Sequence, residues 1–86
     1  MSYHLSVSVK LDPNDETMED WTNVSNKLHK LAQKDCDGAG TGFGVREMDW
    51  SFKDEGDALM AAGRIIEEFE ERLEHIEIEE ETYDVH

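Results

Sequence analysis

The sequence predicts a single α+β domain, residues 1–86, whose strands and helices follow one another in the order β-α-β-α-β. Apolar residues alternate with polar ones near both ends of the chain, which is typical of strands with one buried face. Two longer segments between them repeat their apolar residues at helical spacing. A chain of 86 residues supports one small core, and neither a linker nor an internal repeat divides it.

The first predicted strand covers residues 3–11, and its alternating apolar residues are Tyr3, Leu5, Val7, Val9 and Leu11. The segment 12–15 ends this strand and supplies helix-start chemistry. Either Asp12 caps the helix with Pro13 at its first position, or Thr17 caps it with Asp20 three residues later. The apolar stripe of this helix consists of Met18, Trp21, Val24, Leu28, Leu31 and Ala32.

Residues 35–42 contain too many glycines to continue a helix, so we expect a loop there. A strand is predicted from Phe43 to Phe52, with Met48, Trp50 and Phe52 on one face and the stem of Arg46 along that side. Phe43 and Val45 have the opposite parity, which indicates a bulge near Gly44 or a second buried surface.

Asp54 is a good N-cap for a second helix. Its predicted apolar stripe consists of Ala58, Leu59, Ala62, Ile65, Ile66, Phe69 and Leu73. Ile76 and Ile78 then alternate with polar residues, and this last strand is expected to run to about Tyr83.

Two topologies fit this order of elements. All three strands are parallel in one of them, and the other is a ferredoxin-like sheet whose second strand is reduced to the glycine-rich loop. The polar outward positions of the first and last strands favour the second, because parallel strands are usually buried on both faces. We therefore expect a three-stranded, mainly antiparallel, truncated ferredoxin-like sheet of order 3-1-2, with both helices on one face. Its uncovered edge beside the glycine loop favours a homodimer.

The composition limits the partners and the compartment. Twenty-two acids and eight bases give a net charge of −14, far above the ~2–8 usual for a small domain. Such a chain repels DNA, RNA and anionic membranes and attracts basic proteins. A single cysteine, Cys36, excludes an intramolecular disulfide, and neither a signal peptide nor a membrane-spanning stretch is recognisable. We expect a cytoplasmic protein.

The acidity is concentrated between residues 67 and 84, where ten acids and one base occur. Four glutamates on the predicted helix are spaced i, i+3, i+4 and i+7, and like charges at this spacing destabilise a helix by roughly 0.2–0.5 kcal/mol per pair. They also crowd the C-terminus of the helix, where its dipole favours cations. A pattern that opposes folding indicates selection for another purpose. The predicted partner-binding residues are Glu67, Glu70, Glu71, Glu74, Glu77, Glu79 and Glu81.

These residues predict a non-enzymatic acidic interaction protein whose helix-and-strand surface binds a basic protein and inhibits or recruits it. The most specific form of this hypothesis is an inhibitor of phage or mobile-element origin that mimics the phosphate charge of DNA before a nucleic-acid-binding protein. One alternative is a solvated face that only keeps the protein soluble. Another is a ferredoxin-like dimer that binds a small ligand or acts as a regulatory domain.

The remaining motifs predict no catalysis, cofactor or metal. The glycines of residues 38–44 follow a helix and precede a strand, which is the reverse of a phosphate-binding loop. A calcium loop starting at Asp35 would need an acid at position 46, which is arginine. The acids beside Cys36 oppose thiolate formation, and the four histidines lack zinc-ligand spacing.

Overall fold

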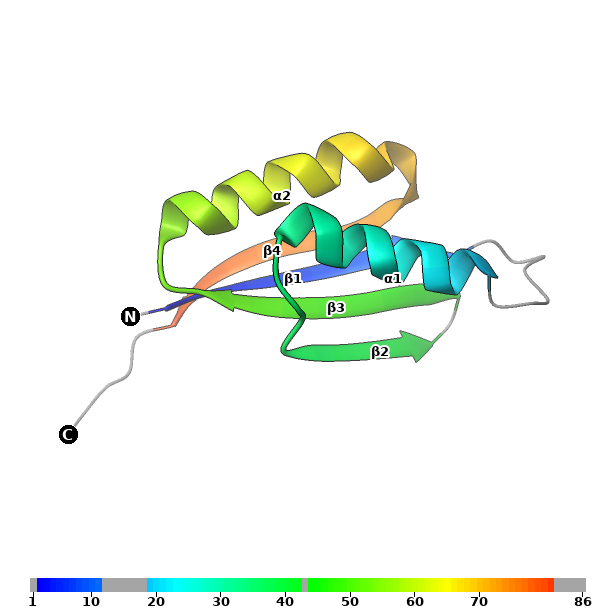
Figure 1. Cartoon of the computed structure of the whole chain (residues 1–86), viewed down its shortest axis with the longest axis horizontal. Coiled ribbons are helices and arrows are strands. Elements are labelled where there is room, and N and C mark those ends of the chain that lie inside the picture. Colours follow the sequence, from blue (N-terminus) through cyan, green and yellow to red (C-terminus); the bar gives the residue numbers. More distant parts are fainter. Residues whose placement is uncertain (1, 12–18, 43, 82–86) are drawn as a thin grey trace.

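The computed structural model describes residues 2–11, 19–42 and 44–81, and it confirms the α+β class. The elements are β1 (Ser2–Lys10), α1 (Glu19–Ala32), β2 (Gly38–Gly42), β3 (Val45–Phe52), α2 (Glu55–Phe69), the 3₁₀ turn η1 (Glu70–Arg72) and β4 (Leu73–Glu81). Both helices lie on the same face of one sheet, as expected, and no described helix covers the other face (Figure 1). Within the described residues, no helix is both long and apolar enough to cross a membrane.

The sheet is antiparallel throughout, with the order β2-β3-β1-β4. β1 lies between β3 and β4, so the predicted order of the three longer strands and their antiparallel direction are confirmed. The predicted number of three strands is wrong, because Gly38–Gly42 pairs with the outer side of β3 as a fourth strand. The edges of the sheet are therefore β2 and β4.

β2 forms although its sequence, GAGTG, has a low strand propensity. The edge of β3 presents backbone N–H and C=O groups that any neighbouring extended backbone can bond, whatever its side chains. Gly44 adopts a φ of 75°, which favours glycine, and its carbonyl oxygen accepts a hydrogen bond of 2.8 Å from the Leu11 N–H. The expected bulge near Gly44 is thus a turn, and β3 begins at Val45. Phe43 lies outside the described residues.

α1 packs its predicted apolar stripe onto the sheet, with Val24, Leu28 and Ala32 buried. The helix ends before Gln33, whose φ of 61° is the left-handed conformation common just after a helix. The two alternative N-caps, Asp12 and Thr17, lie outside the described residues, as does Met18.

α2 begins at its predicted cap, where the Gly56 N–H donates to Asp54 Oδ1 over 2.8 Å. The sequence predicts a helix that continues to Leu73, but α2 ends at Phe69 because Glu70 takes a φ of 43°. Leu73 instead begins β4 and pairs with Val9 of β1. The apolar side chain of Leu73 thus packs against the core from β4. A leucine at this position of a continued helix would also face the core, so the apolar pattern fits both structures.

The core lies between the sheet and the helices. Its largest fully buried side chains come mainly from the inner face of β1 and β3, and they include Leu5, Val7, Val9, Met48 and Trp50. α2 approaches the sheet closely because three alanines, Ala58, Ala61 and Ala62, face it. Two members of its predicted stripe are not in the core, since Leu59 and Ile66 are 55% and 47% exposed.

Candidate functional site

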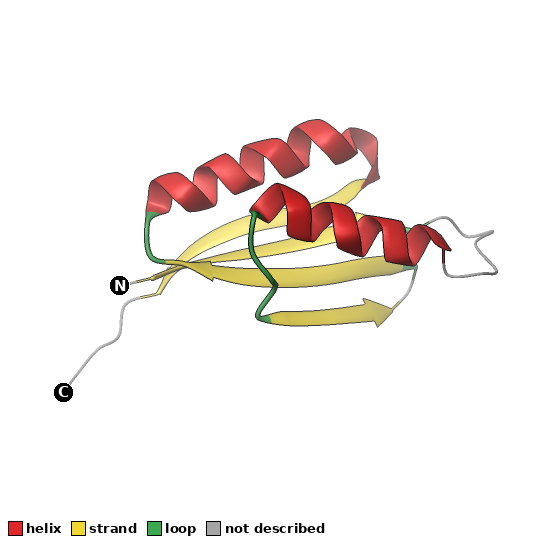
Figure 2. Ribbon diagram, viewed as in Figure 1, coloured by secondary structure: helices red, strands yellow, loops and turns green. Residues whose placement is uncertain are grey.

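The face of the sheet opposite the helices is uncovered in the described part of the chain (Figure 2). We call it the open face, and it consists of the residues that alternate with the buried ones along each strand. These are His4, Ser6 and Ser8 on β1, Glu47, Asp49 and Ser51 on β3, His75, Glu77 and Glu79 on β4, and Gly38 and Gly40 on β2.

Strand register places acids on both sides of a row of serines. Ser6 pairs with Asp49 of β3 on one side and with Glu77 of β4 on the other. In the next row Ser8 pairs with Glu47 of β3. Because neighbouring strands lie about 4.8 Å apart, the backbones that carry these acids are separated by roughly 10 Å, with short side chains between them. A groove of about 580 Å³ results, and its lining includes all five of these residues.

Glycines extend this surface beyond β3 without adding side chains. Gly38 pairs with Asp49, and a Cβ at position 38 would lie 3.1 Å from both carboxylate oxygens of Asp49. A Cβ at Gly40 would meet nothing within 4 Å. The Asp49 carboxylate therefore leans over Gly38, and bare backbone continues the open face to the β2 edge.

Each histidine of the open face lies beside a carboxylate. His4 Nε2 is 4.0 Å from Asp49 Oδ2, and His75 Nε2 is 3.2 Å from Glu77 Oε2. The sequence places His4 and His75 on adjacent strands, but the register separates them by two rows, about 13 Å along the strands. Nowhere in the described residues do three His, Cys, Asp or Glu side chains group closely enough to hold a metal ion.

Among the predicted partner-binding residues whose side chains the structure describes, Glu77 and Glu79 lie on the open face, and both are exposed. Glu81 continues the backbone of β4 beyond them. Glu74 lies where the β4 register shifts and forms an ion pair of 3.5 Å with Lys10 Nζ. Of the strand glutamates, the structure thus brings Glu77 and Glu79 to one face, while Glu74 is ion-paired with Lys10.

The other three predicted residues are elsewhere. Glu67 lies in the last turn of α2, and Glu70 and Glu71 lie in η1, all on the helix side of the molecule. The spacing that joins them to Glu74 along a single helix is interrupted at Phe69. The structure therefore does not bring the seven glutamates together, and we call Glu67, Glu70 and Glu71 the helix-end acids.

Sequence reasoning did not single out Glu47 and Asp49. Their outward direction follows from the parity of the buried Met48 and Trp50, so a signal for their exposure was present. Their position across the serine row follows only from strand register, which the sequence does not reveal. The open-face acids are Glu47, Asp49, Glu77 and Glu79.

A second contact that the sequence did not predict joins His29 and Cys36. His29 Nε2 lies 3.4 Å from Cys36 Sγ, and both side chains are half-buried. A thiol beside an imidazole resembles the start of a nucleophilic arrangement. However, no described residue bonds the other ring nitrogen of His29, so nothing orients this ring as a base.

The chain matches no protein-family model, no curated protein and no solved structure. What the open face can do is set by its groups: carboxylates accept hydrogen bonds from ammonium and guanidinium groups, and serine hydroxyls both donate and accept them. Lys10, the last residue of β1, is paired with Glu74 and not with an open-face acid. The open face is therefore suited to holding cations.

Proposed function

We propose that this chain is a non-enzymatic cytoplasmic interaction domain that docks a basic protein on its open face. The observation that supports this most directly is the placement of carboxylates on both sides of Ser6, with a further one beside Ser8, on a sheet face that no described helix covers. Acids clustered on one sheet face repel one another and do not stabilise the fold. A cationic partner would remove that repulsion on binding.

The spacing of the open-face acids suits a basic segment in extended conformation. Alternate residues of a strand repeat every ~6.7 Å, so lysines or arginines at alternate positions of a bound segment match the repeat of the acids along β3 and β4. The net charge of −14 adds a long-range attraction that speeds encounter with a basic surface. Because added salt screens this attraction, binding should weaken as ionic strength rises.

We further propose that the partner is a nucleic-acid-binding protein, and that docking inhibits it by occupying the surface that meets phosphate groups. Proteins of that class concentrate lysine and arginine where they contact the nucleic-acid backbone. Duplex DNA should then compete with this chain for the partner. A partner that binds DNA and this chain simultaneously would restrict the proposal to docking without mimicry.

The helix-end acids are a separate candidate surface. They lie on the helix side of the sheet, whereas the open-face acids lie on the other side, so a flat partner surface contacts one set only. The two sets allow a matched comparison. The triple variants Glu47→Gln/Glu77→Gln/Glu79→Gln and Glu67→Gln/Glu70→Gln/Glu71→Gln each remove three negative charges and so have the same net charge.

The experiment uses the wild-type chain and both triple variants as bait in a lysate of the native host, at low and at high salt. Loss of a specific basic protein with the open-face variant alone supports docking on the open face. Its loss with the helix-end variant alone moves the docking site to the α2 end. Equal capture by all three chains, without salt dependence, would contradict the proposal, and circular dichroism of each bait controls for folding.

The alternative is a ferredoxin-like dimer that acts as a small-ligand or regulatory domain. The element order β-α-β-β-α-β, with sheet order β2-β3-β1-β4, is that of ferredoxin-like domains and supports this class. β2 also presents an uncharged edge, which does not oppose strand pairing between two copies. Light scattering after size-exclusion chromatography separates the two functions, since the docking proposal holds for a monomer and the alternative requires a dimer.

A further inference from the structure

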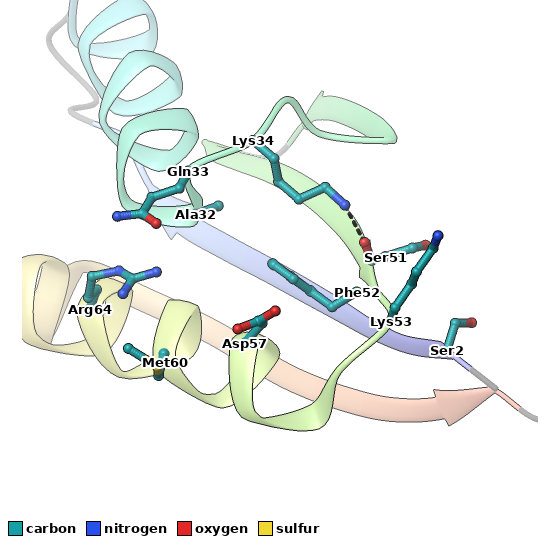
Figure 3. Close-up of a pocket in the computed structure, with 10 residues that line it drawn as sticks. All are labelled: Ser2, Ala32, Gln33, Lys34, Ser51, Phe52, Lys53, Asp57, Met60 and Arg64. Atoms are coloured by element: carbon teal, nitrogen blue, oxygen red, sulfur yellow. Dashed lines mark hydrogen bonds between the residues drawn. The ribbon is translucent and has the colours of Figure 1, made fainter.

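We propose that a second site, at one end of the helix layer, binds a small organic anion that has a carboxylate on an apolar body. The site is a cavity of about 630 Å³ between the C-terminal end of α1, the first turns of α2 and the end of β3 (Figure 3). Cavities of roughly 300–1,000 Å³ are usual for small-molecule sites. It lies on the helix side of the sheet, so it does not depend on docking at the open face.

The charge of this cavity is opposite to that of the molecule. Lys34, Lys53 and Arg64 line it together with one acid, Asp57. The chain as a whole has 8 bases and 22 acids, so the local excess of bases is an inversion of the overall balance. Most of the surface of such an acidic molecule repels anions. The positive charge of this cavity makes it a place that an anion can approach.

Arg64 is oriented for bidentate recognition. Its Nε donates a hydrogen bond of 2.8 Å to the Leu31 carbonyl oxygen, in the last turn of α1, and the side chain is half-buried. This bond fixes the guanidinium plane while the two terminal nitrogens bond no described residue. The edge of the guanidinium that carries these two nitrogens is therefore available. It is an edge that can pair with a carboxylate through two parallel hydrogen bonds.

Lys34 is also held in place. Its Nζ donates to the Ser51 carbonyl oxygen and lies 5.0 Å from the centre of the Phe52 ring (Figure 3). One acceptor and one aromatic face do not neutralise an ammonium group, which has three donors. Lys34 therefore has donors left for an anion at the wall of the cavity.

Lys53 has no such structural role. It lines the cavity and is exposed, yet it forms neither a hydrogen bond nor an ion pair with any described residue. Asp54 and Asp57 follow closely in the sequence, so acids that could pair with it are near. Lys53 is therefore available to a ligand. It lies beside Lys34 and Arg64, which hydrogen bonds to backbone carbonyl groups hold in position.

The floor of the cavity determines what else the ligand contains. Ala32 and Phe52 are buried at its base, and Met60 of α2 lines it with an exposed thioether side chain. These groups favour an apolar body over the hydration shell of inorganic phosphate. Asp57 limits the negative charge that the site tolerates, so a monoanion fits better than a multiply charged ligand.

The test follows backbone amide shifts by NMR while the full chain is titrated with benzoate, benzamide or inorganic phosphate. Benzoate should shift residues 32–34, 51–53 and 57–64, and neutral benzamide should not. Lys53→Met should weaken benzoate binding roughly tenfold, the effect of one charge-assisted hydrogen bond. Lys30→Met removes the same charge from an exposed position of α1 outside the cavity and should leave binding unchanged.

Asp57→Asn is a second variant, chosen because it should strengthen binding, whereas a folding defect would weaken it. Removing this carboxylate should tighten benzoate binding by roughly threefold, because it removes a repulsion. Absence of shifts in the cavity with benzoate, equal binding of benzamide, or unchanged affinity in Lys53→Met would each overturn the proposal. Phosphate binding as tight as that of benzoate would overturn the assignment of an apolar body.

Discussion

At the scale of single residues, Arg46 shows how a charged side chain joins elements that are far apart in the sequence. Its Nε donates to Ser25 Oγ over 3.0 Å, and a terminal nitrogen donates to Thr41 Oγ1 over 2.9 Å. The guanidinium also lies 4.6 Å from the centre of the Trp21 ring, whose Nε1 donates to Thr41 Oγ1. Arg46 thus ties α1 to β2 and β3, and it does so on the face opposite the open-face acids.

Replacing Arg46 should lower stability even though it is a base in an acidic protein. Arg46→Met loses the hydrogen bonds and the cation–π contact, which together contribute about 1–2 kcal/mol. Arg46→Lys keeps the charge but cannot reproduce the planar fork, so it should lose about half of that amount. Chemical denaturation of both variants measures these losses. An unchanged Arg46→Lys would mean that net charge, and not geometry, explains the position.

Tyr3 provides a pH dependence whose sign follows from its surroundings. Burial, together with the negative charges of Glu80, Glu55 and Asp54, raises the pKa of the Tyr3 phenol above its ordinary value of 10.0. The unfolded chain then ionises first, so this contribution to stability is complete below pH 10.0 and is lost as pH rises through the folded-state pKa.

The wild type should therefore lose stability relative to Tyr3→Phe only above about pH 10. Denaturant unfolding of both chains across the alkaline range measures the difference. The chain has two tyrosines, so a spectroscopic titration in a Tyr83→Phe background reports the ionisation of Tyr3 alone. A pH-independent difference between the wild type and Tyr3→Phe would show that the phenol is not perturbed.

At the scale of elements, sequence reasoning succeeded where side chains are periodic and failed where they are absent or ambiguous. β1, both helices and the strand containing Trp50 have apolar repeats, and all were predicted. Gly38–Gly42 was predicted as a loop, because glycines have no side chains that could reveal an alternation. Leu73 fits both the stripe of α2 and the inner face of β4, so periodicity alone could not locate the end of the helix.

The candidate site was predictable to a similar extent. The alternation in the last strand correctly placed Glu77 and Glu79 on one face. The acids opposite them, Glu47 and Asp49, required the register of β1 with β3, which depends on pairing between residues about 40 positions apart. The cationic cavity depends on the positions of Lys53 and Arg64 around the end of α1, and no local pattern encodes such a meeting.

The glycines of the β2–β3 hairpin should respond differently to alanine. Gly40→Ala should stabilise the protein by about 0.4–1 kcal/mol, because a Cβ meets nothing within 4 Å and alanine restricts the unfolded chain. Gly38→Ala should gain less, since Asp49 must move from a Cβ at 3.1 Å. Gly44→Ala should lose about 1 kcal/mol at a φ of 75°. Thermal unfolding of the three variants should give this order, and the reverse order of Gly40→Ala and Gly44→Ala would contradict the described hairpin.

At the scale of the whole molecule, both sides of the sheet carry acids, but the bases that bond neighbouring elements lie mainly on the helix side. The open-face acids lie on one side of the sheet, while Arg46, Arg64 and Lys34 are used on the helix side to bond neighbouring elements. These bases thus hold the helices to the sheet, whereas no lysine or arginine of the described residues pairs with an open-face acid. A face whose acids lack lysine or arginine partners is what the docking proposal requires.

The excess of acids over bases also predicts how salt acts on stability. The described chain measures 49 × 25 × 19 Å, and the Debye length falls from about 30 Å at 0.01 M salt to about 8 Å at 0.15 M. Acids across the width of the molecule therefore repel one another at low salt, and only near neighbours do so at physiological salt. The melting temperature of the wild type should rise over this range, and a salt-independent value would show that self-repulsion is unimportant.

Both triple variants defined above should be more stable than the wild type at low salt, and the gain should shrink as salt is added. The helix-end variant should gain more, by about 1 kcal/mol, because Glu67 also opposes the dipole of α2. If the open-face variant is likewise more stable but no longer captures the partner, then the open-face acids lower the stability of the fold and are needed for binding. Stabilisation without any loss of capture would instead leave the open face as a solubilising surface, since its acids would then have no use beyond their charge.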